Sequence, residues 1–214
     1  MEEEPLPISE PMTVLTDYLL AGVAAALAYR LHRANRSRAA TLWALTFAAT
    51  ALAALVGGSV HGLVPRPPRV FYLLRTATVM SVGAGTACLL AGVVFATVGP
   101  GSLRRVLLAL CALKLALYLA WVARHPEFRY AAYDSAPVGL LVLAFLIRWW
   151  LGSRSRAAGL GVAGMLLSIV GLVLQQSRFG IHDTWFNHND LYHAVQAAAL
   201  WLVQRAGLGL RDAA

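Results

Sequence analysis

Long apolar runs follow one another along almost the whole chain. Seven runs rich in Ala, Leu and Val are each roughly 20 residues long, the length at which a helix crosses the hydrocarbon core of a bilayer. We expect these spans at 13–31, 41–64, 70–98, 103–123, 130–150, 157–175 and 190–206. The runs lack the short alternating segments that a membrane β-barrel requires. The pattern therefore predicts an all-α, polytopic membrane protein built as a bundle of about seven transmembrane helices.

Prolines, glycines and charged residues separate the apolar runs. The breaks include Pro65, Pro67 and Pro68, the segment 99–101 and a longer segment at 177–189. Such residues favour turns, and short connections predict that consecutive helices are antiparallel neighbours in one bundle. We expect one seven-helix transmembrane domain at 13–206, an acidic extramembrane segment at 1–12 and a short cytoplasmic tail at 207–214.

The composition agrees with a bilayer as the solvent of this chain. Apolar residues make up 59% of the 214 residues and charged residues only 13%, with a mean hydropathy of +0.64. A soluble fold of this composition would expose large apolar patches. The expected partners are membrane lipids, including a lipid substrate, and no nucleic acid.

The net charge of +8 indicates an orientation in the membrane. One set of helix ends carries Arg30, Arg33, Arg36, Arg38, Arg104, Arg105, Arg148, Arg154, Arg156, Arg205 and Arg211. The opposite set carries Arg66, Arg69, Arg124, Arg129 and Arg178. Because Lys and Arg are enriched in cytoplasmic loops, we expect the N-terminus outside and the C-terminus in the cytoplasm, in a plasma (inner) membrane.

Polar residues gather at one level of the predicted spans, on the extracytoplasmic side. They are Asp17, His61, Tyr72, Arg75, Tyr133, Asp134, His188, Asp190 and His193. Each of them lies near a helix end that the predicted topology places in the same leaflet. An ionisable group inside a span is costly and by default marks a functional site. The cluster is therefore the candidate site of this chain.

Histidine and carboxylate side chains drawn from different helices suit zinc, whose catalytic sites keep three protein ligands and a water. Asp190 and His193 are three residues apart and share one helical face, whereas His188 is five residues from His193 and points well away. The residues alone favour a ligand set of His61, His193 and either Asp190 or Asp17. Supporting or acid/base groups would then be Arg75 or Asp134.

Two short motifs carry a resemblance to a known family. Gly57-Gly58-Ser59-Val60-His61 ends the second span, and Asn189-Asp190-Leu191-Tyr192-His193 opens the seventh. With seven spans, these motifs resemble the superfamily of alkaline ceramidases and adiponectin-type receptors. That family binds an intramembrane zinc through one histidine of the second helix and two histidines, four apart, at the start of the seventh. The metal activates a water that hydrolyses the amide of a ceramide-like lipid. The resemblance implies zinc on His61 and His193, with Ser59 nearby.

The chain departs from that family at two motif positions. Asn189 stands where the family has the first of its two late histidines, and Gly57 stands where it has a serine. The third span also contains no acidic residue. Either Asp190, His188 or another group supplies the third ligand, or the site has lost its metal.

Three classes of function follow from these patterns. The first is a zinc-dependent hydrolase of a lipid amide, in which a carboxylate such as Asp134 or Asp17 takes and returns the proton. The second is a non-enzymatic receptor-like or structural protein, in which the polar cluster binds a ligand or ties helix ends together. The third is a transporter, for which Lys114 in the middle of the fourth span pairs with a carboxylate or carries a proton. Cys88 and Cys111 fall within spans and are expected to be small buried hydrophobes.

Overall fold

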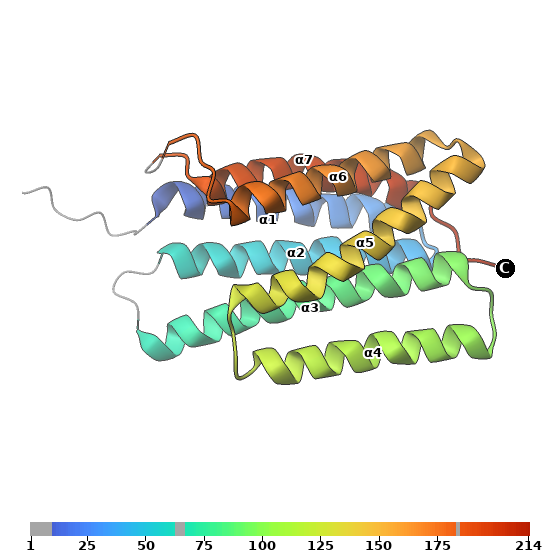
Figure 1. The fold of residues 1–214 in the computed structure, drawn as a ribbon, viewed down its shortest axis with the longest axis horizontal. Coiled ribbons are helices and arrows are strands. Elements are labelled where there is room, and N and C mark those ends of the chain that lie inside the picture. The colour runs from blue at the N-terminus through green and yellow to red at the C-terminus, as the bar shows by residue number, and fades with distance from the viewer. Residues whose placement is uncertain (1–9, 63–66, 183–184) are drawn as a thin grey trace, which may run out of the picture.

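The computed structural model describes residues 10–62, 67–182 and 185–214. Seven helices run up and down along one axis (Figure 1). They are α1 (Pro11–Ala34), α2 (Arg38–Gly62), α3 (Pro68–Thr97), α4 (Ser102–Val122), α5 (Phe128–Ser153), α6 (Arg156–Gln176) and α7 (His188–Gly209). Within the described ranges the β structure is an isolated bridge between His182 and Phe186. The predicted all-α class and the seven helices are confirmed. Residues 1–9 of the predicted acidic segment and Val64, the predicted end of the second span, lie outside the described residues.

The helices extend beyond the predicted apolar runs at most of their ends, because the residues that start or stop a helix lie outside those runs. Helix α3 begins at Pro68, since proline suits the first helical turn, where its missing N–H is not needed. Helix α5 ends at Ser153 and is followed by Arg154 in the left-handed conformation, with φ of 53°. Helix α7 begins at His188 after an Asn187 cap. For most helix ends, the predicted boundary therefore differs from the observed one by a few residues.

Helices α1 to α6 are each long and apolar enough to cross a membrane. Among the described helices, α7 does not meet this criterion, because it carries Asp190, His193 and Gln204 within its length. These three side chains are buried, at 0%, 8% and 3% exposure. Neighbouring helices therefore cover the polar groups of α7, and lipid does not contact them. The chain is a multi-pass membrane protein.

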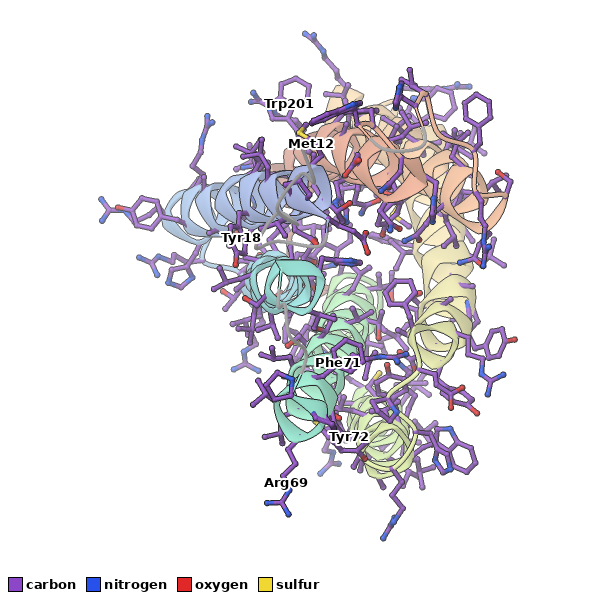
Figure 2. All side chains as sticks on the ribbon, turned by 90° about the vertical axis from the view of Figure 1, so that its left-hand side faces the viewer. Met12, Tyr18, Arg69, Phe71, Tyr72 and Trp201 are labelled. Carbon is purple, nitrogen blue, oxygen red and sulfur yellow. The ribbon has the colours of Figure 1, made fainter. Side chains whose placement is uncertain are left out.

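The helix contacts form a ring. Helix α1 packs on α2 and α7, α2 packs on α3, α3 packs on α5, α5 packs on α6, and α6 packs on α7. Helix α4 lies at the edge of the bundle against α3 (Figures 1 and 2). The larger core cluster includes Trp43, Phe47 and Leu31, all of which are almost fully buried. Many other large apolar side chains are exposed on the outer faces, as a lipid-facing surface requires.

Glycines allow close contacts between the helices. A Cβ atom on Gly161 would lie 2.6 Å from the Ala206 Cβ, and one on Gly164 would lie 2.8 Å from the Ala199 carbonyl oxygen. Gly83 faces the ring of Tyr118 in the same way. Small residues let membrane helices approach closely and gain van der Waals contact. Cys88 and Cys111 are free thiols, half-buried and buried respectively, which confirms their expected packing role.

The segment after α7 is packed against the bundle. Helix α7 continues to Gly209, three residues into the predicted tail at 207–214. Asp212 then accepts hydrogen bonds from the backbone N–H groups of Ala39 and Arg38, at 2.8 and 3.1 Å. The Ala213 N–H donates to the Phe95 carbonyl at 2.8 Å. The predicted tail therefore caps α2 and links it to α3.

Candidate functional site

The fold brings the predicted polar residues to one end of the bundle. The beginnings of α1, α3, α5 and α7 and the ends of α2, α4 and α6 share this end, which Figure 2 views along the helices. Asp17, Asp190 and His193 lie in the first two turns of α1 and α7 at this end, whereas Asp134 contacts Thr86 and Lys114, which lie near the middle of α3 and α4. Their side-chain contacts nevertheless divide them into two separate clusters, described below.

The first cluster joins α1 to α7, and we call it the α1–α7 cluster: Thr13, Thr16, Asp17, Asn187, Asp190 and His193. The His193 Nε2 atom lies 3.3 Å from Asp17 Oδ1. Its Nδ1 atom lies 3.0 Å from Thr16 Oγ1, and the same hydroxyl lies 3.1 Å from Asp190 Oδ1. Asp17, Asp190 and His193 are buried, at 4%, 0% and 8% exposure. Two carboxylates and an imidazole thus share one buried network.

The start of α7 is fixed by a capping box. The Asn187 side chain accepts hydrogen bonds from the backbone N–H groups of Asn189 and Asp190, and the Asp190 Oδ2 atom accepts one from the Asn187 N–H at 2.8 Å. This reciprocal arrangement satisfies backbone donors that a helix start leaves unpaired. The Asn187 amide also donates to Thr13 Oγ1 at 3.2 Å. The Asp190 carboxylate therefore accepts hydrogen bonds both from the start of α7 and from Thr16.

The hydrogen bonds set the orientation of the His193 ring. Thr16 has one hydroxyl hydrogen, and a bond to the buried carboxylate of Asp190 is stronger than a bond to a neutral acceptor. The Thr16 oxygen then accepts from the His193 Nδ1–H, so Nε2 faces Asp17. A bare Nε2 lone pair and a carboxylate oxygen at this distance repel each other. The pair is therefore stable when a proton or a metal cation lies between the two atoms.

One carboxylate oxygen of Asp17 could accept a further interaction. Its Oδ2 atom is buried and has no hydrogen-bond partner among the described residues. Gly57 and Gly58 bring α2 against it: a Cβ atom on Gly58 would lie 2.9 Å from the Asp17 Cβ, and one on Gly57 would lie 3.8 Å from Oδ1. An unsatisfied buried carboxylate oxygen is costly. A proton or a cation at Asp17 would satisfy this atom.

His61 was expected to contribute a ligand from α2, but its side chain contacts a different partner. It lies one turn after Gly57 on α2, and its Nδ1 atom is 3.2 Å from Glu10 Oε2. Among the residues that the structure describes, no group of three His, Cys, Asp or Glu side chains is arranged to hold a metal ion. The predicted three-ligand set is therefore not assembled here. Two of its members, Asp17 and His193, are in contact.

The Asp17–His193 spacing fits two zinc ligands. Two donors that are each roughly 2.0–2.1 Å from a tetrahedral zinc lie about 3.3 Å apart, and the observed separation of Nε2 and Oδ1 is 3.3 Å. Zinc-bound histidines also donate their other ring N–H to an oxygen, which fixes the ring. Thr16 is positioned to accept that bond. The pair fits zinc, and a third protein ligand has to come from a neighbouring side chain.

Other predicted residues lie away from this pair. Ser59 contacts the Leu55 carbonyl and the Tyr18 hydroxyl, at 3.1 and 3.2 Å. The Arg75 guanidinium lies 5.6 Å from the Phe71 ring centroid. His188 is the first residue of α7 and is half-buried. The structure gives no contact between these three predicted residues and Asp17 or His193.

The second cluster lies inside the membrane between α3, α4 and α5. Asp134 Oδ2 accepts from Lys114 Nζ at 2.6 Å and from Thr86 Oγ1 at 2.6 Å, and Lys114 is also 3.0 Å from Thr86. The predicted pairing of Lys114 with a carboxylate is confirmed. Asp134 was predicted to act as an acid/base group beside the histidines. Its described contacts do not support this role, because α5 directs the Asp134 side chain toward α3 and α4.

The sequence analysis missed Thr13, Thr16 and Asn187. A capping-box spacing was present in the sequence, with Asn187 three residues before Asp190, and it would have identified Asn187. Thr16 had no such signal, since a hydroxyl near a helix end is common. Its role depends on the packing of α1 against α7.

Comparison with known proteins gives one match. A protein-family model described as a family of unknown function, DUF6962, matches residues 12–212. This range covers all seven helices and nearly the whole chain. No curated protein matches the chain, and no solved structure matches it.

Proposed function

Because this chain belongs to the DUF6962 family, whose function is unknown, we propose a function from the α1–α7 cluster itself. We propose a membrane-embedded, zinc-dependent hydrolase of a lipid amide, similar in mechanism to the alkaline ceramidase superfamily. The observation that carries this proposal is the buried Asp17–His193 pair. The pair is stable with a proton or a metal cation between its two atoms, and Asp17 Oδ2 is left without a partner among the described residues.

Four residues of the α1–α7 cluster, together with His61, have distinct roles in this proposal. Asp17 and His193 would hold the metal, and His61 would supply the third ligand from α2. Thr16 and Asp190 orient the His193 ring through its Nδ1 atom. When bound, zinc supplies a water that is activated near neutral pH for attack on a carbonyl carbon.

A carboxylate is also needed to take and return the proton of the water. Asp134 is held by Lys114 and Thr86, so it is poorly placed for this role. Glu10 lies 3.2 Å from His61 and is part-exposed. We assign the proton transfer to Glu10, and we expect the acyl chain to lie along the apolar outer faces of the helices.

The orientation of the protein belongs to the same proposal. The end that holds the α1–α7 cluster also carries Arg69, Arg124, Arg129 and Arg178, whereas the opposite end carries more than twice as many arginines. By the positive-inside rule, the opposite end is cytoplasmic. The site then opens on the extracytoplasmic side of a plasma (inner) membrane.

Metal content is the experiment that tests this proposal. We expect about one zinc per chain in the full-length protein purified in detergent, measured by elemental analysis, because structural and catalytic zinc sites bind tightly enough to survive purification. His193→Ala and Asp17→Asn should lose the metal, because each removes one of the two donors in contact. In a screen for lipid-amide hydrolysis, the activity of each variant should then correlate with its metal content.

His125→Ala is the matched control for the loss of an imidazole. His125 lies at the same end of the bundle, stacked on Trp121 at 4.2 Å. Zinc that is absent from the wild-type protein, or that disappears equally from the His125 variant, would contradict a site at Asp17 and His193.

A second candidate function has its own supporting observation. Asp190 is fully buried and bonded to Asn187 and Thr16, so the cluster also ties α7 to α1. In a receptor-like or structural protein this would be its whole role. That function predicts a metal-free protein in which His193→Ala lowers the melting temperature.

A further inference from the structure

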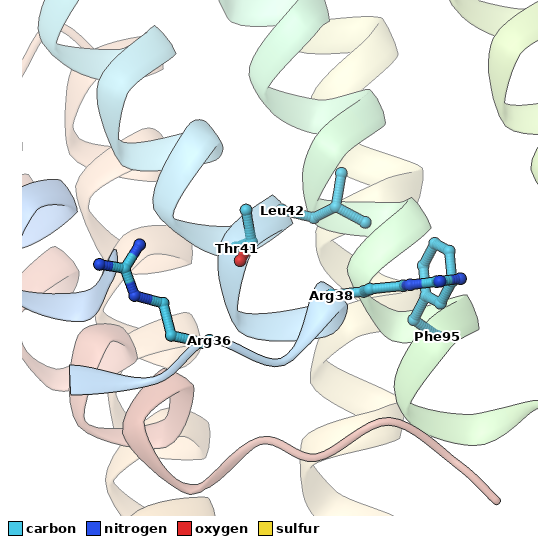
Figure 3. A pocket seen from close by; sticks show the side chains of 5 residues that line it. All are labelled: Arg36, Arg38, Thr41, Leu42 and Phe95. Atoms are coloured by element: carbon cyan, nitrogen blue, oxygen red, sulfur yellow. The ribbon is translucent and has the colours of Figure 1, made fainter. Parts of the chain in front are cut away.

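The end of the bundle opposite the α1–α7 cluster contains an arginine-lined cleft. Arg36, Arg38, Thr41, Leu42 and Phe95 enclose about 290 Å³ between the start of α2 and the last turn of α3 (Figure 3). The two arginines form its polar rim. Leu42 and Phe95 form its apolar wall. The cleft thus combines positive charge with an apolar surface.

The arginine charges at this cleft are not neutralised by the protein. The Arg38 and Arg104 guanidinium groups lie 5.7 and 5.4 Å from the Phe95 ring centroid, and Arg36 contacts the His32 ring. Among the described residues, no carboxylate forms an ion pair with these three arginines. The nearby Asp212 carboxylate is bonded to backbone N–H groups at the start of α2. The cleft therefore presents free positive charge.

The depth of the cleft matches the headgroup region of a bilayer. Helix α2 begins at Arg38 and α3 ends at Thr97, and both helices are apolar enough to cross a membrane. The ends of spanning helices lie at the boundary between hydrocarbon and headgroups. The rim of the cleft therefore lies at the level of lipid phosphates, and its apolar wall lies at the level of the first acyl carbons.

We propose that this cleft binds the phosphate headgroup of an anionic phospholipid. Guanidinium groups match phosphate oxygens in charge and geometry. Figure 3 shows Arg38 extending toward Phe95 and Arg36 extending to the opposite side, so Arg38 pairs with the phosphate and Arg36 adds positive charge at the other side of the cleft. The Thr41 hydroxyl is a further donor at the rim. The acyl chain of the same lipid packs along Leu42 and Phe95.

A second cleft at the same end repeats this chemistry. Arg156, Ala157, Leu160, Trp201 and Arg205 enclose about 410 Å³ between α6 and α7. The Arg205 guanidinium lies 4.8 Å from the Trp201 ring centroid. Two clefts that each combine two arginines with an aromatic and an aliphatic wall indicate that this end of the bundle is adapted to anionic lipid.

The test measures lipid binding to the purified full-length protein. The protein is delipidated in detergent, and its dissociation constants for phosphatidylglycerol and phosphatidylcholine are determined by native mass spectrometry. The double variant Arg36→Gln, Arg38→Gln removes the two rim charges. We expect it to bind phosphatidylglycerol about thirty-fold more weakly than the wild-type protein does, with phosphatidylcholine binding unchanged.

The matched control removes the same charge from the other end of the bundle. Arg69→Gln, Arg124→Gln changes two exposed arginines near the α1–α7 cluster, and Figure 2 shows Arg69 pointing away from the helices. This control should keep wild-type affinity for phosphatidylglycerol. Equal melting temperatures of the two double variants establish that both are folded.

Three results would overturn the proposal. The first is equal loss of phosphatidylglycerol binding in both double variants, because binding would then follow net charge alone. The second is no loss in the Arg36, Arg38 variant. The third is full displacement of the lipid by millimolar inorganic phosphate, because the apolar wall would then contribute nothing to binding.

Discussion

The Lys114–Asp134 pair offers the sharpest test of how the bundle is held together. The Lys114 side chain is 28% exposed and that of Asp134 is 8% exposed, and Lys114 is the chain's single lysine. Removing either partner would leave the other charge without its ion-pair partner, although the hydrogen bond to Thr86 would remain.

The magnitude follows from the cost of an unpaired intramembrane charge. Lys114→Met and Asp134→Leu should each lower the free energy of unfolding by about 3 kcal/mol. The double variant removes both charges and retains similar volume, so it should lie within about 1 kcal/mol of the wild-type protein. The coupling energy of the double-mutant cycle is then about 5 kcal/mol.

The assay is equilibrium unfolding in mixed micelles with increasing sodium dodecyl sulfate, followed by the fluorescence of the six tryptophans. Leu113→Met, a change at an exposed position next to Lys114, is the control and should shift stability by less than about 0.5 kcal/mol. Additive single effects, with the double variant about 6 kcal/mol less stable than the wild-type protein, would refute the reasoning.

Two further predictions concern packing and capping. Gly164→Ala should destabilise the protein by about 2 kcal/mol, because the new methyl group would lie 2.8 Å from the Ala199 carbonyl oxygen. Gly22→Ala meets no atom within 4 Å and should be neutral or slightly stabilising. Equal effects of the two changes in thermal unfolding would contradict this account. Asp212→Ala removes the side-chain acceptor at the start of α2 and should lower stability by about 1 kcal/mol, whereas Asp212→Asn keeps one acceptor oxygen and should retain part of the stability.

The number and order of the helices could be predicted from the sequence because each apolar run by itself requires a helix in a bilayer. Depth along the helix was predictable for the same reason for Asp17 and His193, which lie near one end, whereas Asp134 contacts the mid-helix residues Thr86 and Lys114. Hydropathy does not, however, state which helices are neighbours. Asp134 turns to α3 and α4 because α5 packs on α3, and only the fold shows that.

The local details of the site depended on side chains that hydropathy treats as ordinary. Thr16 connects His193 to Asp190 through a single hydroxyl, and its position follows from the packing of α1 on α7. Gly58 allows α2 to lie against Asp17, since a Cβ atom there would lie 2.9 Å from the Asp17 Cβ. The sequence alone could not indicate this contact between α1 and α2.

The docking of Asp212 on the start of α2 has a consequence for membrane insertion. The two backbone donors at Arg38 and Ala39 find their acceptor more than 170 positions later in the chain, after all seven helices. During synthesis α2 enters the membrane long before that carboxylate is made. The insertion machinery therefore handles an α2 whose first turn does not yet have this acceptor.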